Sequence, residues 1–205
     1  MTASAWHRNY DDGIPHTLEP YPQQTLLDYL SANAREAPTH PALLFKGRHI
    51  SYKQLERLSE SFGSALIELG VKPGDRVALC LPNCPQFMIA EFGAWKAGAI
   101  VCPFNPTYSE REMEEALRAT GAETVVVLNR TYSQIKSIQP RTSVKHVIAT
   151  NIKEYLPLKL RIGYTLFKEK KEGDRIHLRD GDARFTSLLR RGRRRIQGVR
   201  TSEAP

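Results

Sequence analysis

The sequence predicts an α/β fold: a doubly wound, mostly parallel sheet with flanking helices. Three apolar runs, at 76–81, 99–103 and 123–128, are almost unbroken. Such runs are typical of strands that are covered on both faces, as in a parallel sheet. Helical patterns separate the runs, and strands that alternate with helices predict βαβ units. The length of 205 residues suffices for one good-sized domain, or for a domain with an extension.

The first 52 residues predict an arm, a helix and a hairpin. Residues 1–22 are polar and rich in proline, and we expect them to form an arm laid over the body. A helix is predicted over 24–36, because its leucines share one face and Pro38 follows it. Residues 42–45 and 49–52 flank a Lys-Gly-Arg turn and predict a short hairpin.

Two capping boxes mark the starts of later helices. Ser51 with Gln54, and Ser109 with Glu112, have the spacing that links an N-cap serine to a residue three positions later. Gly70 ends the first of these helices, at a position where a left-handed cap favours a residue without Cβ. That helix carries an apolar stripe on one face: Leu55, Leu58, Phe62, Ala65, Leu66 and Leu69.

Shorter patterns complete the sheet and its helices. A turn at 72–75 leads into the first buried strand. A helix over 85–96 is closed by Gly98, which lets the next strand begin close to the helix end. After the third apolar run, a short helix near 132–138 and a strand at 146–149 are predicted.

Charge divides the chain into two parts. Residues 1–150 carry 15 basic and 15 acidic side chains, so the whole excess of +8 falls on 151–205. We expect 23–150 to form the α/β subdomain, 151–189 a basic and apolar connecting segment, and 190–205 a disordered arginine-rich tail. The arginines lack aromatic interleaving, which argues against a specific nucleic-acid partner.

The segment from Tyr155 to Lys171 allows two interpretations. Its apolar residues, with basic residues beside them, favour an anionic membrane surface. Alternatively, it is a connecting segment that packs on the rest of a larger enzyme. Its apolar positions fit a strand period and a helix period, so the periodicity does not decide its structure.

Cysteines and histidines predict no metal centre. Cys80, Cys84 and Cys102 match no zinc pattern, and the first and last lie in or beside apolar runs, where cysteine is a small buried side chain. The six histidines are scattered without ligand-like spacing. Unpaired cysteines and the lack of a signal-peptide pattern predict a cytoplasmic protein, peripheral at the membrane if Tyr155–Lys171 is an anchor.

A series of short motifs carries a family resemblance. The motifs are Ser51-Tyr52-Lys53-Gln54-Leu55, Gly74-Asp75-Arg76-Val77-Ala78, Leu81-Pro82-Asn83 with Pro85, Trp95-Lys96-Ala97-Gly98-Ala99, Asn105-Pro106, and the run at 121–127. In this order and spacing, they resemble the N-terminal region of the AMP-forming acyl-CoA ligases, the acyl-activating adenylate-forming enzymes. The resemblance covers about residues 20–150 and is strongest to the long-chain fatty acid–CoA ligases.

The resemblance implies a reaction for the full-length family. ATP activates a fatty acid through an acyl-adenylate, and coenzyme A then takes the acyl group, so ATP, Mg²⁺ and coenzyme A are implied. The family's Ser/Thr/Gly loop ending in Lys-Gly, which cradles phosphates, is absent from these 205 residues, as is a Walker motif. The resemblance therefore implies a truncated N-terminal part with an incomplete sheet, inactive alone, which a complementing C-terminal half would complete.

We expect no catalytic, cofactor-binding or metal residue in this chain, and no cofactor for the chain alone. Lys96 invites assignment as a phosphate ligand, but its place near a helix C-terminus favours a structural role. Asp75 and Arg76 are expected to serve the turn and the strand entry. The alternative function is a non-enzymatic α/β module that binds an acyl chain, a membrane surface or a partner.

Overall fold

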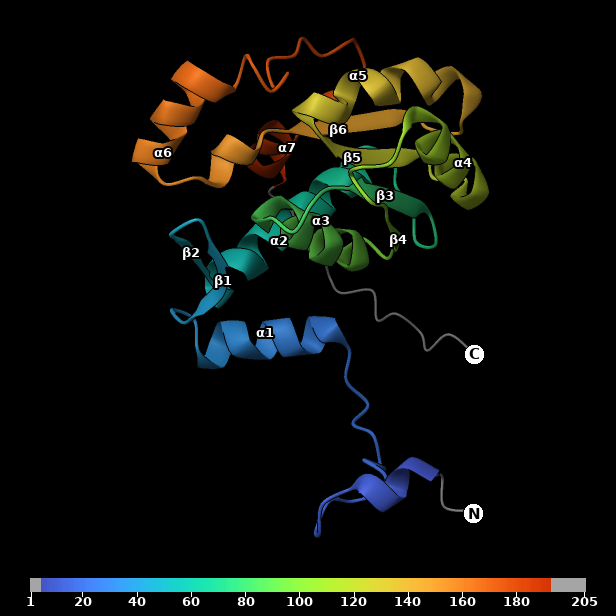
Figure 1. The fold of residues 1–205 in the computed structure, drawn as a ribbon, viewed down its shortest axis with the longest axis vertical. Helices are drawn as coiled ribbons and strands as arrows, with labels where there is room; N and C mark the ends of the chain where they lie inside the picture. The colour runs from blue at the N-terminus through green and yellow to red at the C-terminus, as the bar shows by residue number, and fades with distance from the viewer. Residues whose placement is uncertain (1–4, 193–205) are drawn as a thin grey trace.

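The computed structural model describes residues 5–192, in which five parallel strands lie between two layers of helices (Figure 1). The strand order is β4-β3-β5-β6-β7, and each neighbouring pair is parallel. The strands are β3 (Arg76–Cys80), β4 (Ile100–Pro103), β5 (Thr124–Leu128), β6 (His146–Thr150) and β7 (Ala183–Arg184). The prediction of an α/β fold with a mostly parallel sheet is confirmed.

The helices cover both faces of the sheet. On one face lie α2 (Tyr52–Glu68), α3 (Pro85–Lys96) and α7 (Phe185–Arg191). On the other face lie α4 (Glu110–Thr120) and α5 (Asn129–Ile138). Figure 1 shows this division, with α5 above the sheet, α4 at its right, and α2 and α3 below it.

Side chains on the central strands alternate between two cores. Leu79, Val126 and Ile148 pack with the α2 and α3 layer, whereas Ala78 and Val125 pack with the α4 and α5 layer. All five are fully buried. Successive side chains of a strand point to opposite faces, so a strand between two helix layers needs apolar residues at every position.

β4 is an edge strand, and its apolar run at 99–103 was wrongly predicted to be buried. Among the described strands it pairs only with β3, and Ile100 is 50% exposed. An apolar run cannot distinguish a strand with two neighbours from one with a single neighbour, because pairing depends on chain topology.

Capping residues near the helix starts correctly predicted where α2 and α4 begin. Both predicted capping boxes are present, with Ser51 and Ser109 as N-caps. A third box, between Thr25 and Asp28, escaped prediction and starts α1 (Leu26–Glu36) two residues later than expected. Because Ser51 caps α2, the second hairpin strand ends at Ser51 instead of continuing to residue 52.

The hairpin and α1 extend the α2 layer away from the sheet. β1 (Pro41–Phe45) and β2 (Arg48–Ser51) pair in antiparallel register, and α1 packs on α2. Residues 5–24 then run away from the body, with a 3₁₀ helix, η1 (Ala5–Asn9), near their start (Figure 1). The expectation that this arm lies over the body is wrong.

Gly98 occupies a tight connection between α3 and β4. Its φ is +76°, a conformation that side chains with a Cβ disfavour. A Cβ at this position would lie 3.1 Å from Pro73 Cβ. The close helix-to-strand transition predicted at this glycine is therefore present.

The chain after β6 leaves the sheet and returns to it. It forms α6 (Leu158–Gly163) and a π-helix, η4 (Tyr164–Lys168), before β7 and α7. Phe185 of α7 is fully buried, with its ring centroid 4.7 Å from that of Phe62 in α2. α7 includes the first two arginines of the predicted tail, and residues 193–205 lie outside the described residues.

Candidate functional site

The chain reverses its direction across the sheet at β3. From β3 it passes to β4 on one side, and then to β5 on the other side. In doubly wound folds, ligands bind beyond the carboxyl ends of the strands at such a switch point. Residues 81–84 follow β3 at this point and lead into α3, with Pro85 in the first turn.

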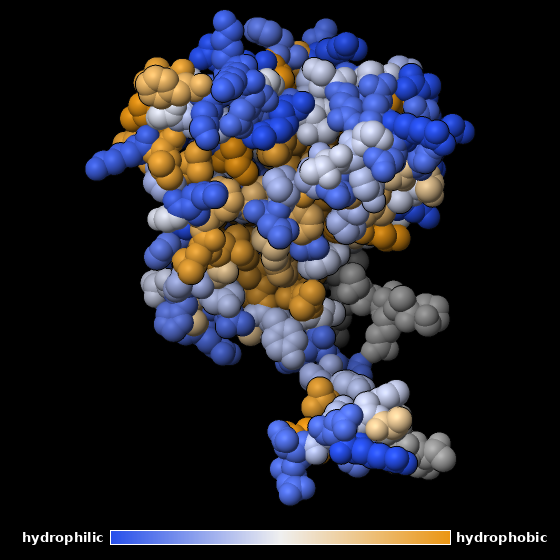
Figure 2. All heavy atoms as spheres, viewed as in Figure 1, coloured by the Kyte–Doolittle hydropathy of each residue, from blue (hydrophilic) through white to orange (hydrophobic). Residues whose placement is uncertain are grey.

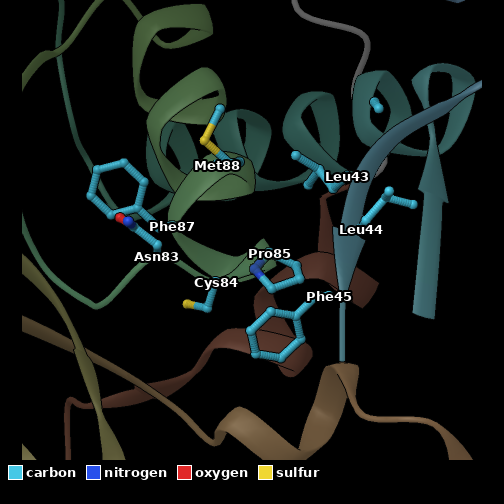
Figure 3. A pocket seen from close by; sticks show the side chains of 9 residues that line it. Leu43, Leu44, Phe45, Asn83, Cys84, Pro85, Phe87 and Met88 are labelled. Carbon is cyan, nitrogen blue, oxygen red and sulfur yellow. The ribbon is translucent and has the colours of Figure 1, made fainter. Parts of the chain in front are cut away.

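A cleft of about 290 Å³ lies beside the N-terminus of α3, and we name it the α3 cleft. Figure 2 shows hydrophobic side chains gathered between the hairpin and α3 on this face. In the close view of Figure 3, Phe87 and Met88 project from α3, opposite Leu43 and Leu44 of β1. The lining consists of Ala42, Leu43, Leu44, Phe45, Asn83, Cys84, Pro85, Phe87 and Met88.

The α3 cleft suits an apolar group and contains no acid–base pair. Its polar lining side chains are Asn83 and the thiol of Cys84. Burial raises the pKa of Cys84 to about 11, although hydrogen bonds from the backbone of Phe87 and Gln86 oppose the shift. The thiol is therefore protonated at neutral pH, and a thiol is a far weaker nucleophile than a thiolate.

A cluster around Asp174 closes over the carboxyl end of β5. The Asn129 amide donates to the backbone oxygen of Asp174 at 2.8 Å, and Arg130 Nη2 lies 3.1 Å from Asp174 Oδ2. The Tyr164 hydroxyl donates to the same carboxylate, and Glu172 lies 3.0 Å from that hydroxyl. Burial, together with these carboxylates, raises the pKa of Tyr164.

A second cluster around Glu169 covers the end of β6. Lys153 Nζ lies 2.5 Å from Glu169 Oε1, and Asn151 Nδ2 donates to the same oxygen at 3.2 Å. Arg175 Nε lies 3.8 Å from the other oxygen. Both clusters join residues 151–175 to the strand ends, so their charges are used for structure.

Gln86 links α3 to the end of β6. It is fully buried, and its amide donates to Asn151 O at 3.0 Å and to Thr150 Oγ1 at 3.3 Å. Within the described chain, its Oε1 has no hydrogen-bond partner. Glu154, which accepts from Thr150 Oγ1 at 2.7 Å, has its pKa raised by burial.

The residues weighed from the sequence, Lys96, Asp75 and Arg76, have separate structural roles and do not form one site. Lys96 is buried, and its Nζ lies 2.7 Å from Glu56 Oε2, so it joins α3 to α2. The Asp75 carboxylate accepts from the Lys72 backbone at 2.8 Å, as expected of a turn residue. Arg76 is exposed at the start of β3.

The cysteines and histidines do not converge on one site. Cys80 and Cys84 are buried, but Cys102 is only partly covered, because β4 lies at the edge. His7 and His16 stack at 4.3 Å in the N-terminal arm. No group of three or more His, Cys, Asp or Glu within residues 5–192 could hold a metal ion. No helix in that range has the length and hydropathy required to cross a bilayer.

Sequence reasoning missed the α3 cleft and both polar clusters. A signal for the clusters was available, because Asn129 directly follows the strand predicted at 123–128 and Asn151 lies two residues after the strand predicted at 146–149, at the edge where ligands or covering segments lie. The cleft had no local signal, since residues 42–45 and 83–88 meet only in the folded chain.

Known proteins are similar to this chain in sequence. The family model described as "AMP-binding enzyme" matches residues 30–175. A long-chain-fatty-acid–CoA ligase of Bacillus subtilis is 32% identical over 166 residues, which are 81% of this chain and 30% of that protein. The enzyme of the same name from Haemophilus influenzae is 36% identical over 152 residues, 74% of this chain and 27% of that protein.

Solved structures show the same fold. The anthranilate CoA ligase AuaEII superposes with a TM-score of 0.64 at 22% identity, covering 80% of this chain and 27% of that chain. A long-chain-fatty-acid-CoA ligase from Archaeoglobus fulgidus superposes with a TM-score of 0.56 at 23% identity, covering 66% and 30%.

The chain spans about a third of the length of these proteins. The Yersinia pestis ligase, 30% identical over 192 residues, matches 92% of this chain but only 34% of its own length. The five-stranded sheet thus corresponds to one part of a larger enzyme fold. Since the family model covers most of the sequence, this chain belongs to the AMP-binding enzyme family.

Proposed function

We propose that this chain is the N-terminal part of a long-chain fatty acyl-CoA ligase. The complete enzyme joins a fatty acid to ATP, forming an acyl-adenylate and pyrophosphate, and then passes the acyl group to coenzyme A. The observation that carries the proposal is the 36% identity to a long-chain-fatty-acid–CoA ligase over 152 residues. Three free cysteines, of which Cys80 and Cys84 are buried, agree with a cytoplasmic location for it.

In this proposal, the chain supplies scaffold and does not form an adenylate by itself. Its 205 residues contain no Ser/Thr/Gly-rich phosphate loop. The charges at the carboxyl edge, such as Asp174 and Glu169, already pair with neighbouring side chains. ATP, Mg²⁺ and coenzyme A would therefore be held by the remaining part of the enzyme, which complements this chain.

ATP–pyrophosphate exchange with a panel of fatty acids tests the proposal. We expect background exchange from the purified chain, and exchange above background when the missing part of a long-chain ligase is added. A complete ligase of the family serves as the positive control. Robust exchange by the 205-residue chain alone would show that it holds the adenylation site.

A second candidate function is a non-enzymatic module that binds an acyl chain. The specific support is the α3 cleft, whose lining is almost wholly apolar. Displacement of a fluorescent fatty acid by dodecanoate, without ATP, measures such binding. The module would bind saturably, and Met88→Lys, which places a charge in the cleft, would weaken binding, whereas the exposed Leu18→Ser change would not. Absence of displacement would exclude this candidate.

A further inference from the structure

Residues 156–171 form a helical projection, which we name the α6 arm, with an apolar outer surface. It contains α6 and the π-helix η4. Figure 2 shows hydrophobic side chains gathered over α6, with hydrophilic ones beside them. Single proteins rarely expose large contiguous apolar patches without a binding role. Five exposed apolar side chains lie within ten residues: Leu158 (71%), Leu160 (52%), Ile162 (52%), Leu166 (69%) and Phe167 (79%).

The charge of the α6 arm is entirely positive on its exposed side. Its basic residues are Lys159, Arg161, Lys168, Lys170 and Lys171, and all five are exposed. None of them forms an ion pair with another residue in the range 5–192. The one acidic residue of the arm, Glu169, is buried against Lys153. The apolar surface is thus flanked by five exposed basic side chains, of which Arg161 interacts electrostatically with Glu154.

Contacts at the start of the α6 arm and within it attach the arm to the rest of the chain. Tyr155 is buried just before it, with the Arg48 guanidinium 5.5 Å above its ring. Within the arm, the Tyr164 hydroxyl donates to the Asp174 carboxylate and accepts from Arg130 Nη2 of α5 at 3.3 Å, and Glu169 pairs with Lys153 at 2.5 Å. These contacts hold the polar side of the arm inward, so its apolar and basic side faces outward in a fixed arrangement.

We propose that the α6 arm docks this protein on an anionic membrane surface. Its apolar side chains would enter the boundary between headgroups and acyl chains, while the basic side chains contact the headgroups. A protein partner fits this composition poorly, because lysine is depleted from protein–protein interfaces. Long basic side chains beside apolar ones instead suit the lipid interface. This proposal goes beyond the ligase reaction and does not depend on it.

Vesicle flotation with the full 205-residue chain tests the proposal. One set of vesicles contains phosphatidylcholine alone, and the other contains phosphatidylcholine with phosphatidylserine. We expect strong partitioning only to the anionic vesicles, and weaker partitioning as salt rises, because salt screens the lysines. Every variant keeps the C-terminal arginines, so their contribution is common to all measurements.

Two variants separate the apolar and electrostatic contributions. The Leu166→Ser/Phe167→Ser variant removes two exposed apolar side chains and should lower the partition coefficient roughly 10-fold at every salt concentration. The Lys168→Gln/Lys170→Gln/Lys171→Gln variant should lower it on the order of 100-fold at low salt, with a smaller effect at high salt. Because all five side chains are exposed, circular dichroism should show unchanged folding.

Matched substitutions outside the arm provide the controls. Leu18→Ser/Ile67→Ser removes two exposed apolar side chains, and Lys53→Gln/Arg57→Gln/Lys72→Gln removes three exposed positive charges. Both should leave the partition coefficient within about twofold of the original, since charges beyond a Debye length of the membrane contribute little.

Three results would overturn the proposal. The first is equal partitioning to both kinds of vesicle, and the second is unchanged partitioning of both arm variants. The third is a chain that self-associates in sedimentation, binds no vesicles, and becomes monomeric in the Leu166→Ser/Phe167→Ser variant, since a second copy would then cover the arm.

Discussion

The packing of α7 on α2 predicts a large stability loss for Phe185→Ala. Phe185 is fully buried, and its ring lies 4.7 Å from the Phe62 ring between the two helices. Truncation removes the buried ring and leaves a cavity, which for phenylalanine costs about 3–5 kcal/mol. Backbone atoms of α2 and α3 surround Phe62 closely: a Cβ on Gly93 would lie 2.9 Å from Phe62 Cδ1. The site therefore has little freedom to collapse into the cavity.

Urea unfolding followed by circular dichroism measures this effect. A loss of 4 kcal/mol would lower the midpoint by about 2 M if the slope is near 2 kcal/mol per molar urea. Phe167→Ala is the matched control, because the same truncation at a 79% exposed side chain should change stability by less than about 0.5 kcal/mol. A loss below about 1 kcal/mol for Phe185→Ala would refute the reasoning, since α7 would then not cover α2 in solution.

Further measurements test the connection, the buried pair and the thiols. Gly98→Ala should lower the free energy of unfolding by about 1–3 kcal/mol, because φ at this position is +76° and Pro73 is close. Gly163→Ala, with open space around the new Cβ, should raise it by up to about 1 kcal/mol, and urea titrations measure both changes. Lys96→Met should lower the free energy of unfolding by about 2 kcal/mol, because it leaves the Glu56 carboxylate without its counter-charge. The double variant Lys96→Met/Glu56→Leu should recover most of that loss. Burial raises the pKa of the Cys80 thiol to about 12 from an ordinary 9.0. Between these two pH values the unfolded chain loses the thiol proton and the folded chain keeps it, so the free energy of unfolding should fall as pH rises from about 9 to about 12. The fall should be less steep in Cys80→Ala, which lacks this thiol.

The elements whose signals are local were predictable from the sequence. Ser51 and Ser109 cap their helices as the spacing predicts, because a capping box involves only neighbouring residues. Gly70 and Gly121 adopt positive φ at helix ends for the same local reason. The doubly buried strands were also predictable, since their apolar residues occupy consecutive positions.

Features that depend on distant contacts were not predictable. The burial of Lys96 depends on Glu56, 40 residues earlier, and no spacing rule links them. β7 pairs through two residues only, too few for a strand pattern. The α6 arm had an ambiguous period, and the contacts of its Tyr164 with Asp174 and of its Glu169 with Lys153 arise only in the folded chain. The candidate cleft likewise requires β1 and α3 to meet.

The late return of the chain to the sheet has a consequence for synthesis on the ribosome. β6 ends at Thr150, but α7, which covers Phe62, ends at Arg191. Translation at about 5–20 residues per second leaves an interval of roughly 2–8 s in which four strands of the five-stranded sheet have been made while their α2 side stays partly uncovered. A nascent chain in that interval presents an apolar surface to chaperones. The core between the sheet and the α2 layer is therefore complete only after α7 has been synthesised.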